Sequence, residues 1–250
     1  MALADYQAAH ESLPPGVTNP DGPIRNIAEG IHIGWAVSLL PYIDEQATLQ
    51  QIDMSLGVYA EKNAPARAVP IGLLRCPSSD IPPVMVGKDV AISSYAGCHN
   101  DVESPIDDDN HGVLFLDSRI RGEDITDGAT HTIFLGEKLS ADDDLGWMSG
   151  TRATLRNTGT PLRRTPGDHV AIVRGMPLDD DPDAEPGNNR PNDDLFVGGF
   201  GSWHATVTNF LFGDGAVRSV SNDIDPAILQ QLGHRADGKL LDAGPTREPW

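Results

Sequence analysis

The chain has 250 residues, and 18 Lys and Arg stand against 37 Asp and Glu, so that the formal net charge at pH 7 is −19. A surface this acidic repels the phosphates of nucleic acids and anionic membranes, which excludes nucleic acid as a partner. The length fits one domain, 1–250, with a sizeable core, whereas 26 Gly and 20 Pro argue against a helical bundle. No run of 18 apolar residues occurs, so no membrane span is predicted within this sequence.

The N-terminal part carries the first helical signals. Residues 2–11 have helical character that the sequence LPPG at 13–16 ends, and they resemble the tail of a longer helix whose first part is not included here. A second helix is predicted over residues 41–52, because Pro41 fits a first helical turn and an apolar stripe follows it. At the other end of the chain, Asp225 as N-cap and Pro226 as first helical residue predict a short C-terminal helix.

From about residue 70 onward, short β-rich runs are separated by Gly, Asp and Asn, which predicts an antiparallel sheet and hence an α+β fold. The Asp214-Gly215 pair between the last two runs predicts a hairpin turn with positive φ. Between the runs 130–138 and 205–212 lies the stretch 174–194, whose acidic, Pro- and Gly-rich composition is typical of a surface loop. The predicted strand runs are 91–98, 112–116, 130–138, 205–212 and 216–221.

Cys76 and Cys98 are the only cysteines, and they lie 22 residues apart beside turn residues. A bond between them would contribute roughly 3 kcal/mol through the entropy of the unfolded chain. Two free buried thiols are the alternative. We expect the disulfide, and with it an oxidising compartment.

Ser202 and His204 raise the question of nucleophilic catalysis. A strand-to-helix serine elbow of the type G-x-S-x-G would require glycine at positions 200 and 204, where Phe200 and His204 stand. No orienting carboxylate or oxyanion site is evident from the spacing. A serine hydrolase is therefore the least favoured class.

The densest acidic cluster, PIDDDNHG at 105–112, suggests calcium as the one candidate cofactor. Asp107 and Asp109 occupy alternate positions, as in the start of an EF-hand loop, but the twelfth position is Ser118 in place of Glu. A solvated loop is the alternative to a calcium site. The eight histidines are scattered and show no H-x-x-x-H, H-E-x-x-H or C-x-x-C spacing, so zinc is not predicted.

Tryptophans offer a second kind of binding site. Trp147 and Trp203 are candidates for a carbohydrate-binding face, with core packing as the alternative. No glycine-rich phosphate-binding loop is found, so nucleotide binding is not predicted.

His204 is followed, after nine residues, by Asp214 and Gly215. In a straight hairpin, His204 would lie about 25 to 30 Å from the turn, too far for chemistry shared with Asp214. We therefore expect separate structural roles: His204 hydrogen-bonded to a neighbouring segment, and Asp214-Gly215 forming the turn.

The stretch GGFGSWHATVTNFLFGDGAVRSVSNDID, together with YQAAHESLPPG, WAVSLLPYIDEQ, LRCPSSD and LGWMSGTRATLRNTG, resembles the prepilin-type processing-associated H-X9-DG family, the domain of unknown function 1559. Members of that family typically begin with a class III prepilin signal and a hydrophobic helix. The resemblance implies a pilin-like plan, with an N-terminal helix packed on an antiparallel sheet. It implies a location in the cell envelope or outside the cell, a membrane anchor in the N-terminal helix, and assembly with like subunits.

The family has no established reaction, so the resemblance assigns no catalytic role to His204, Asp214 or Gly215. The expected function is that of a non-enzymatic structural or assembly protein of the pseudopilus or surface-filament type. A carbohydrate- or solute-binding module is the alternative.

Overall fold

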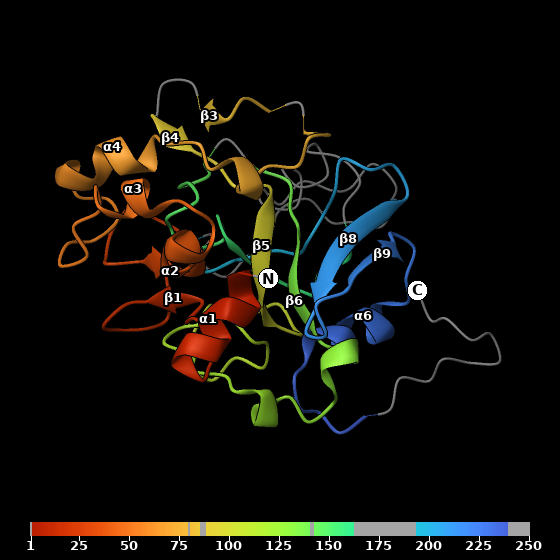
Figure 1. The fold of residues 1–250 in the computed structure, drawn as a ribbon. Coiled ribbons are helices and arrows are strands. Elements are labelled where there is room, and N and C mark those ends of the chain that lie inside the picture. The colour runs from red at the N-terminus through yellow and green to blue at the C-terminus, as the bar shows by residue number, and fades with distance from the viewer. Residues whose placement is uncertain (1, 80, 86–88, 141–142, 163–193, 240–250) are drawn as a thin grey trace.

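The computed structural model describes residues 2–79, 81–85, 89–140, 143–162 and 194–239. Its centre is a five-stranded sheet with the strand order β7-β5-β6-β8-β9, and helices and long loops surround this sheet (Figure 1). The α+β prediction is confirmed. The predicted acidic loop at 174–194 lies, except for Asp194, outside the described residues.

The sheet is mixed, so the prediction of antiparallel pairing throughout is wrong at one edge. β5 pairs with β6, β6 with β8 and β8 with β9 in antiparallel fashion, but β7 runs parallel to β5. A parallel neighbour requires a long crossover connection, and here β6 and its flanking loops lie between the two strands in the chain. The bounds are Tyr95–Asn100 for β5, Ile133–Glu137 for β6, Leu155–Asn157 for β7, Val207–Phe212 for β8 and Val217–Ser221 for β9.

The predicted strand at 112–116 does not form. Its Val113 and Leu114 are fully buried in a loop, and Leu116 makes only an isolated bridge to Val17. A short apolar run signals burial, which a loop over a core satisfies as well as a strand does. The further pairs are two-stranded: β1 (Val17–Thr18) with β2 (Ile33–Gly34), and β3 (Val84–Met85) with β4 (Val90–Ala91).

Both terminal helix predictions are confirmed, whereas the predicted helix over 41–52 is broken into short pieces because Asp44 adopts a φ of 60°. The C-terminal helix α6 (Pro226–Gly233) is capped by Asp225, whose Oδ1 accepts a hydrogen bond from the Ala227 N–H at 2.8 Å. No helix among the described residues is long and apolar enough to cross a membrane. The remaining helices are α1 (Ala2–His10), α2 (Trp35–Leu39), α3 (Gln46–Leu49) and α4 (Ala64–Arg67), with 3-10 turns η1 (Leu40–Tyr42), η2 (Glu61–Asn63), η3 (Gly72–Leu74), η4 (Gly122–Asp124) and η5 (Ala129–His131).

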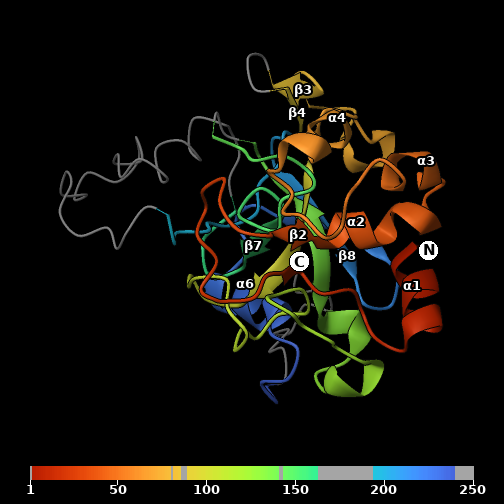
Figure 2. The ribbon, with the colours of Figure 1, turned by 90° about the vertical axis from the view of Figure 1, so that its left-hand side faces the viewer.

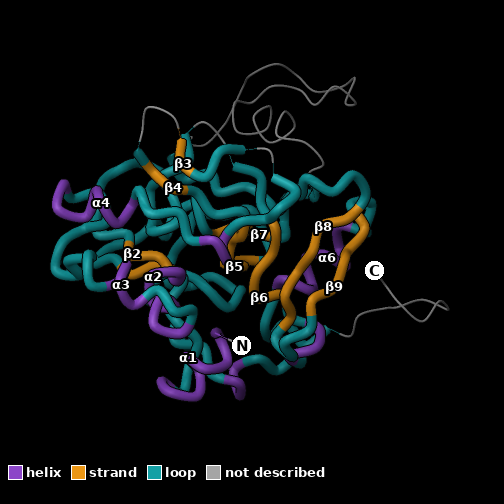
Figure 3. The backbone as a smooth tube through the Cα atoms, turned by 45° about the horizontal axis from the view of Figure 1, so that its top comes forward, coloured by secondary structure: helices purple, strands orange, loops and turns teal. Residues whose placement is uncertain are grey.

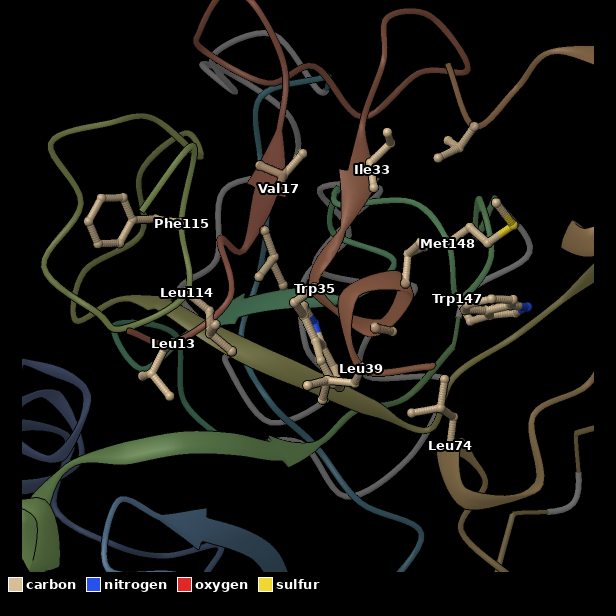
Figure 4. Close-up of a cluster of buried hydrophobic side chains, with 14 of the residues drawn as sticks. Leu13, Val17, Ile33, Trp35, Leu39, Leu74, Leu114, Phe115, Trp147 and Met148 are labelled. Atoms are coloured by element: carbon tan, nitrogen blue, oxygen red, sulfur yellow. The ribbon is translucent and has the colours of Figure 1, made fainter. Parts of the chain in front are cut away.

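Two cores lie on opposite faces of the sheet. Figure 2 shows α1 and α2 on one side and α6 on the other. The larger core includes Trp35 of α2, Leu114 and Trp147, and Figure 4 shows Trp35 near its centre. The smaller core lies between the sheet and α6 and contains Phe210 and Phe212 of β8. Because side chains alternate along a strand, Asn209 and Leu211 of β8 face the other way.

β8 and β9 extend the sheet beyond the helical layer. Figure 3 shows them on the side of the sheet away from α1 to α4. α1 contacts α2 and η1, and its Leu3 is the residue buried in the larger core. The face of β8 and β9 opposite α6 is therefore left partly uncovered, and this face borders the candidate site.

Candidate functional site

Glu137 at the end of β6 is the centre of a polar cluster beside the uncovered face of the sheet. Its side chain is only 5% exposed. One carboxylate oxygen, Oε2, accepts three hydrogen bonds: from the Ser202 hydroxyl at 2.9 Å, from the Asn209 N–H at 2.8 Å and from Asn209 Nδ2 at 3.1 Å. These three donors fix the plane and direction of the carboxylate.

The other oxygen, Oε1, faces a thiol and an imidazole. Cys76 Sγ lies 3.6 Å from it and His204 Nε2 lies 3.3 Å from it. Cys76 follows η3 and His204 precedes β8, so three distant segments meet at this point. Possible ligand atoms of Cys76, Glu137 and His204 all lie within 4.8 Å of one another. We call Cys76, Glu137, Ser202, His204 and Asn209 the Glu137 cluster.

Tyr95 lies beside this cluster, since it pairs directly with Glu137 across β5 and β6. Burial raises the pKa of Tyr95, and the nearby Cys76 and Glu137 raise it further. The Tyr95 phenol therefore keeps its proton beside the cluster.

Asp214 and Gly215 lie at the turn between β8 and β9, as expected, and Gly215 has a φ of 82°. The Asp214 carboxylate accepts hydrogen bonds from Arg218 Nη2 at 2.5 Å and from the Ala216 N–H at 2.9 Å. The hydrogen bond from Arg218, and then that from Ala216, lower the pKa of Asp214. His204 and Asp214 thus have different partners.

Cys76 and Cys98 are both free and buried, so the predicted disulfide is wrong. Cys98 is on β5 and points into the core beneath α6, where its thiol donates to the carbonyl oxygens of Asn100 at 3.7 Å and Gly233 at 3.6 Å. Burial raises the pKa of this thiol. Cys76 instead contacts Glu137. A spacing of 22 residues cannot tell on which face of a sheet each cysteine lies.

Trp147 and Trp203 do not form the predicted carbohydrate-binding face. Trp147 is fully buried in the larger core (Figure 4), whereas Trp203 is partly exposed next to His204. The alternative of core packing is therefore correct for Trp147. Ser202 is buried and donates to Glu137, an arrangement that does not favour a nucleophile.

The described residues form two clusters of three potential metal ligands, and Asp107 and Asp109 belong to neither. Asp107 Oδ1 accepts from the Asp108 N–H at 3.0 Å, as expected of a solvated turn. The second cluster contains Asp101, His111 and His234. His111 Nδ1 lies 2.9 Å from Asp101 Oδ1, but His234 Nδ1 accepts the Ala236 N–H at 2.9 Å. That bond places the proton of neutral His234 on Nε2, which leaves this ring without a free ligating nitrogen.

An apolar groove runs beside the Glu137 cluster along the uncovered face of the sheet. One part, of about 390 Å³, reaches Glu137, and a second part, of about 170 Å³, continues beneath α1 and α2. Both parts share the side chains of Leu73, Tyr95, Leu135 and Leu211. Leu73 is 68% exposed and Val217 is 69% exposed, the highest values among the large apolar residues described. We call this surface the apolar groove.

The sequence pointed to Cys76 and His204, but it gave no indication of Glu137, of Ser202 as its partner, or of Asn209. The available signal was an acidic residue at the end of the apolar run IFLGE, a position where an unpaired charge is costly. No sequence pattern linked Glu137 to His204, which lies 67 positions later in the chain.

The chain matches the family described as "Protein of unknown function (DUF1559)", SBP_bac_10, over residues 1–227. It therefore belongs to this family. Comparison with curated proteins and with solved structures gave no significant match.

Proposed function

We propose that this chain is a non-enzymatic structural module of the bacterial cell envelope or its exterior, with a pilin-like plan, and that it associates with like subunits through the apolar groove. The groove is the observation that carries the proposal. It places the two most exposed large apolar residues described, Leu73 and Val217, on one continuous surface of a protein with a net charge of −19.

Two copies of so acidic a chain repel each other at long range. Association of like subunits must then rest on burial of apolar surface, which is independent of charge. Concentrated apolar patches on otherwise charged proteins mark interaction surfaces. The groove supplies such a patch where the sheet extends past the helices.

The pilin-like part of the proposal rests on the resemblance of the sequence and on the position of α1. This helix lies over one face of the sheet layer, and its Leu3 lines the inner part of the groove. In the proposed arrangement, membrane anchoring belongs to the hydrophobic N-terminal helix typical of the family, while the acidic domain faces water.

Sedimentation velocity over a concentration series tests the association. The wild-type chain is expected to self-associate, and more strongly as NaCl is raised, because salt screens the repulsion. Val217→Asp should abolish association by placing a charge in the groove. Val102→Asp is the matched control, because Val102 is also exposed, at 42%, and does not line the groove. A monomer at every concentration and salt, or equal loss in both variants, contradicts the proposed interface.

The location is tested on the full-length protein in its source cells. Fractionation followed by immunoblotting should recover it in envelope or extracellular fractions. Recovery in the cytosolic fraction alone contradicts this part of the proposal.

A further inference from the structure

We propose that Cys76, Glu137 and His204 bind one Zn²⁺ ion. This inference goes beyond the structural role proposed above and does not depend on it. It rests on the geometry of the three ligand atoms, on the hydrogen bonds that hold the carboxylate, and on the chemistry of the three side chains.

The distances between ligand atoms match the edges of a tetrahedral zinc site. Zinc lies about 2.0 to 2.2 Å from nitrogen and oxygen ligands and about 2.3 Å from sulfur. A tetrahedron with these lengths separates nitrogen from oxygen by about 3.4 Å and sulfur from oxygen by about 3.6 Å. His204 Nε2 and Glu137 Oε1 are 3.3 Å apart, and Cys76 Sγ and Glu137 Oε1 are 3.6 Å apart.

The third edge joins Cys76 to His204, whose ligand atoms lie within 4.8 Å of each other. The tetrahedral value for a sulfur–nitrogen edge is about 3.6 Å, so a shift of about 1.2 Å or less reaches it. His204 can make that shift because its side chain is 36% exposed, whereas Cys76 and Glu137 are buried.

The hydrogen bonds around Glu137 fix the orientation of its carboxylate, as is typical of a metal-binding carboxylate. Oε2 of Glu137 is occupied by the Ser202 hydroxyl and by two donors of Asn209, which leaves Oε1 directed at Cys76 and His204. Metal-binding carboxylates are oriented by such outer partners, and loss of one partner typically lowers metal affinity 10- to 100-fold. Ser202 and Asn209 are therefore positioning residues.

The ligand set selects zinc over calcium. Thiolate and imidazole are zinc ligands, whereas calcium takes oxygen ligands alone. On binding, the Cys76 thiol releases its proton to solvent and forms the Zn–S bond, and neutral His204 binds through the lone pair of Nε2. Three protein ligands leave a fourth position for water, which reaches the cluster past the half-exposed His204.

Cobalt substitution tests the site without relying on any variant. The wild-type chain titrated with Co²⁺ under reducing conditions should develop thiolate-to-cobalt charge-transfer absorption that saturates at one equivalent and disappears when Zn²⁺ is added. Ca²⁺ should not displace the cobalt. Absence of the thiolate band in folded wild-type protein overturns the proposal.

Two pairs of variants assign the ligands. Cys76→Ser should abolish the thiolate band, whereas Cys98→Ser should keep it, because Cys98 lies in the core beneath α6. His204→Gln should lower Zn²⁺ affinity by about 100-fold or more, while His111→Gln should leave it unchanged. His111 belongs to the separate cluster with Asp101 and is the matched control.

Ser202→Ala should lower Zn²⁺ affinity about tenfold and keep the thiolate band, as expected for a positioning residue. Far-UV circular dichroism establishes that each variant is folded. If Cys76→Ser does not fold, the wild-type spectrum and the His204→Gln and His111→Gln pair decide the question. A band that survives Cys76→Ser, or equal affinity losses in the two histidine variants, overturns the assignment.

Discussion

Two buried charges on consecutive residues are compensated in different ways. Glu137 accepts hydrogen bonds from the neutral donors Ser202 and Asn209, and His204 Nε2 lies 3.3 Å from its Oε1. Lys138 is fully buried and pairs with the buried carboxylate of Asp144. Burial lowers the pKa of Lys138, and Asp144 opposes that effect by stabilising the ammonium form.

Asp144→Asn should therefore cost about 3 to 5 kcal/mol of unfolding free energy, because it leaves the Lys138 ammonium buried without a counter-charge. Asp144 also stabilises the buried cation of Arg156. Urea unfolding at pH 7 measures the loss. The double variant Lys138→Met with Asp144→Leu should recover part of the loss, since both charges of the pair are then absent while the buried Arg156 cation still lacks Asp144. A loss of less than about 1 kcal/mol in Asp144→Asn would show that the pair is not needed for stability.

His99 makes the stability depend on pH. Its Nδ1–H donates to Asn110 Oδ1 at 3.0 Å, Nε2 has no hydrogen-bond partner, and burial lowers the pKa of His99 to about 4. The unfolded chain has a value of about 6.5. Protonation of His99 thus favours unfolding. The stability that the neutral, buried His99 contributes is fully present above about pH 6.5 and is lost as the pH falls toward about 4.

Between pH 7 and pH 5 the unfolding free energy should fall by about 2 kcal/mol because of His99. Urea unfolding at the two pH values provides the measurement. His32 is buried as well, and burial also lowers its pKa to about 4, so it adds a loss of the same sign. His99→Gln should reduce the pH dependence. An unchanged dependence in that variant would assign the effect to other groups.

At the scale of elements, the β8–β9 hairpin has the Asp214-Gly215 turn at one end, and its strand β8 carries Asn209 of the Glu137 cluster. Gly215 donates to the Phe212 carbonyl at 3.0 Å and closes the turn, and the strands then pair in a register that places Asn209 opposite Ser219. The Ser219 hydroxyl donates to Asn209 Oδ1 at 2.6 Å. The turn therefore helps to orient the residue that holds Glu137.

Gly215→Val should cost about 1 to 2 kcal/mol of stability, because a β-branched residue resists the φ of 82°. No neighbouring atom lies within 4 Å of a Cβ at this position, so the cost is backbone strain and not a clash. Asp214→Asn should cost about 1 kcal/mol or less, because Asn keeps an acceptor for the Ala216 N–H and loses only a partly exposed ion pair. Thermal unfolding compares the two, with Gly215→Asn as the control that tolerates positive φ. A larger loss in Asp214→Asn than in Gly215→Val contradicts this assignment.

At the scale of the whole molecule, one sheet carries two cores. The helices α1 and α2 cover part of one face and α6 covers the other (Figure 2), and β6 and β8 contribute side chains to both cores. The groove and the Glu137 cluster lie where the helical cover ends. The chain carries a net charge of −19, and the mutual repulsion of its carboxylates disfavours the compact state.

NaCl should therefore raise the unfolding midpoint of the chain. Screening at about 0.5 M salt weakens the repulsion between exposed carboxylates, while the two apolar cores are unaffected by screening. Calorimetry at low and high NaCl measures the shift, and the monomeric Val217→Asp variant separates it from association. A midpoint that falls with salt would indicate that attractive surface ion pairs outweigh the net repulsion.

Several features follow from the sequence alone because their causes are local. The cap at Asp225, the Pro226 start of α6 and the glycine turn at 215 depend on hydrogen bonds and φ values within a few residues. The alternation along β8 likewise follows from the two-residue repeat of a strand. Composition, charge and the motif blocks also indicated the α+β class and the family.

Only the tertiary structure decided which distant residues meet. The parallel pairing of β7 with β5, the separation of Cys76 from Cys98 and the burial of Trp147 depend on how the chain crosses the sheet. The histidine and cysteine spacings did not point to zinc, whereas Cys76, Glu137 and His204 come together in the fold from three segments 61 and 67 residues apart. Their meeting is set by strand register and by which face each side chain takes, and a single slip in register would turn Glu137 away from both partners.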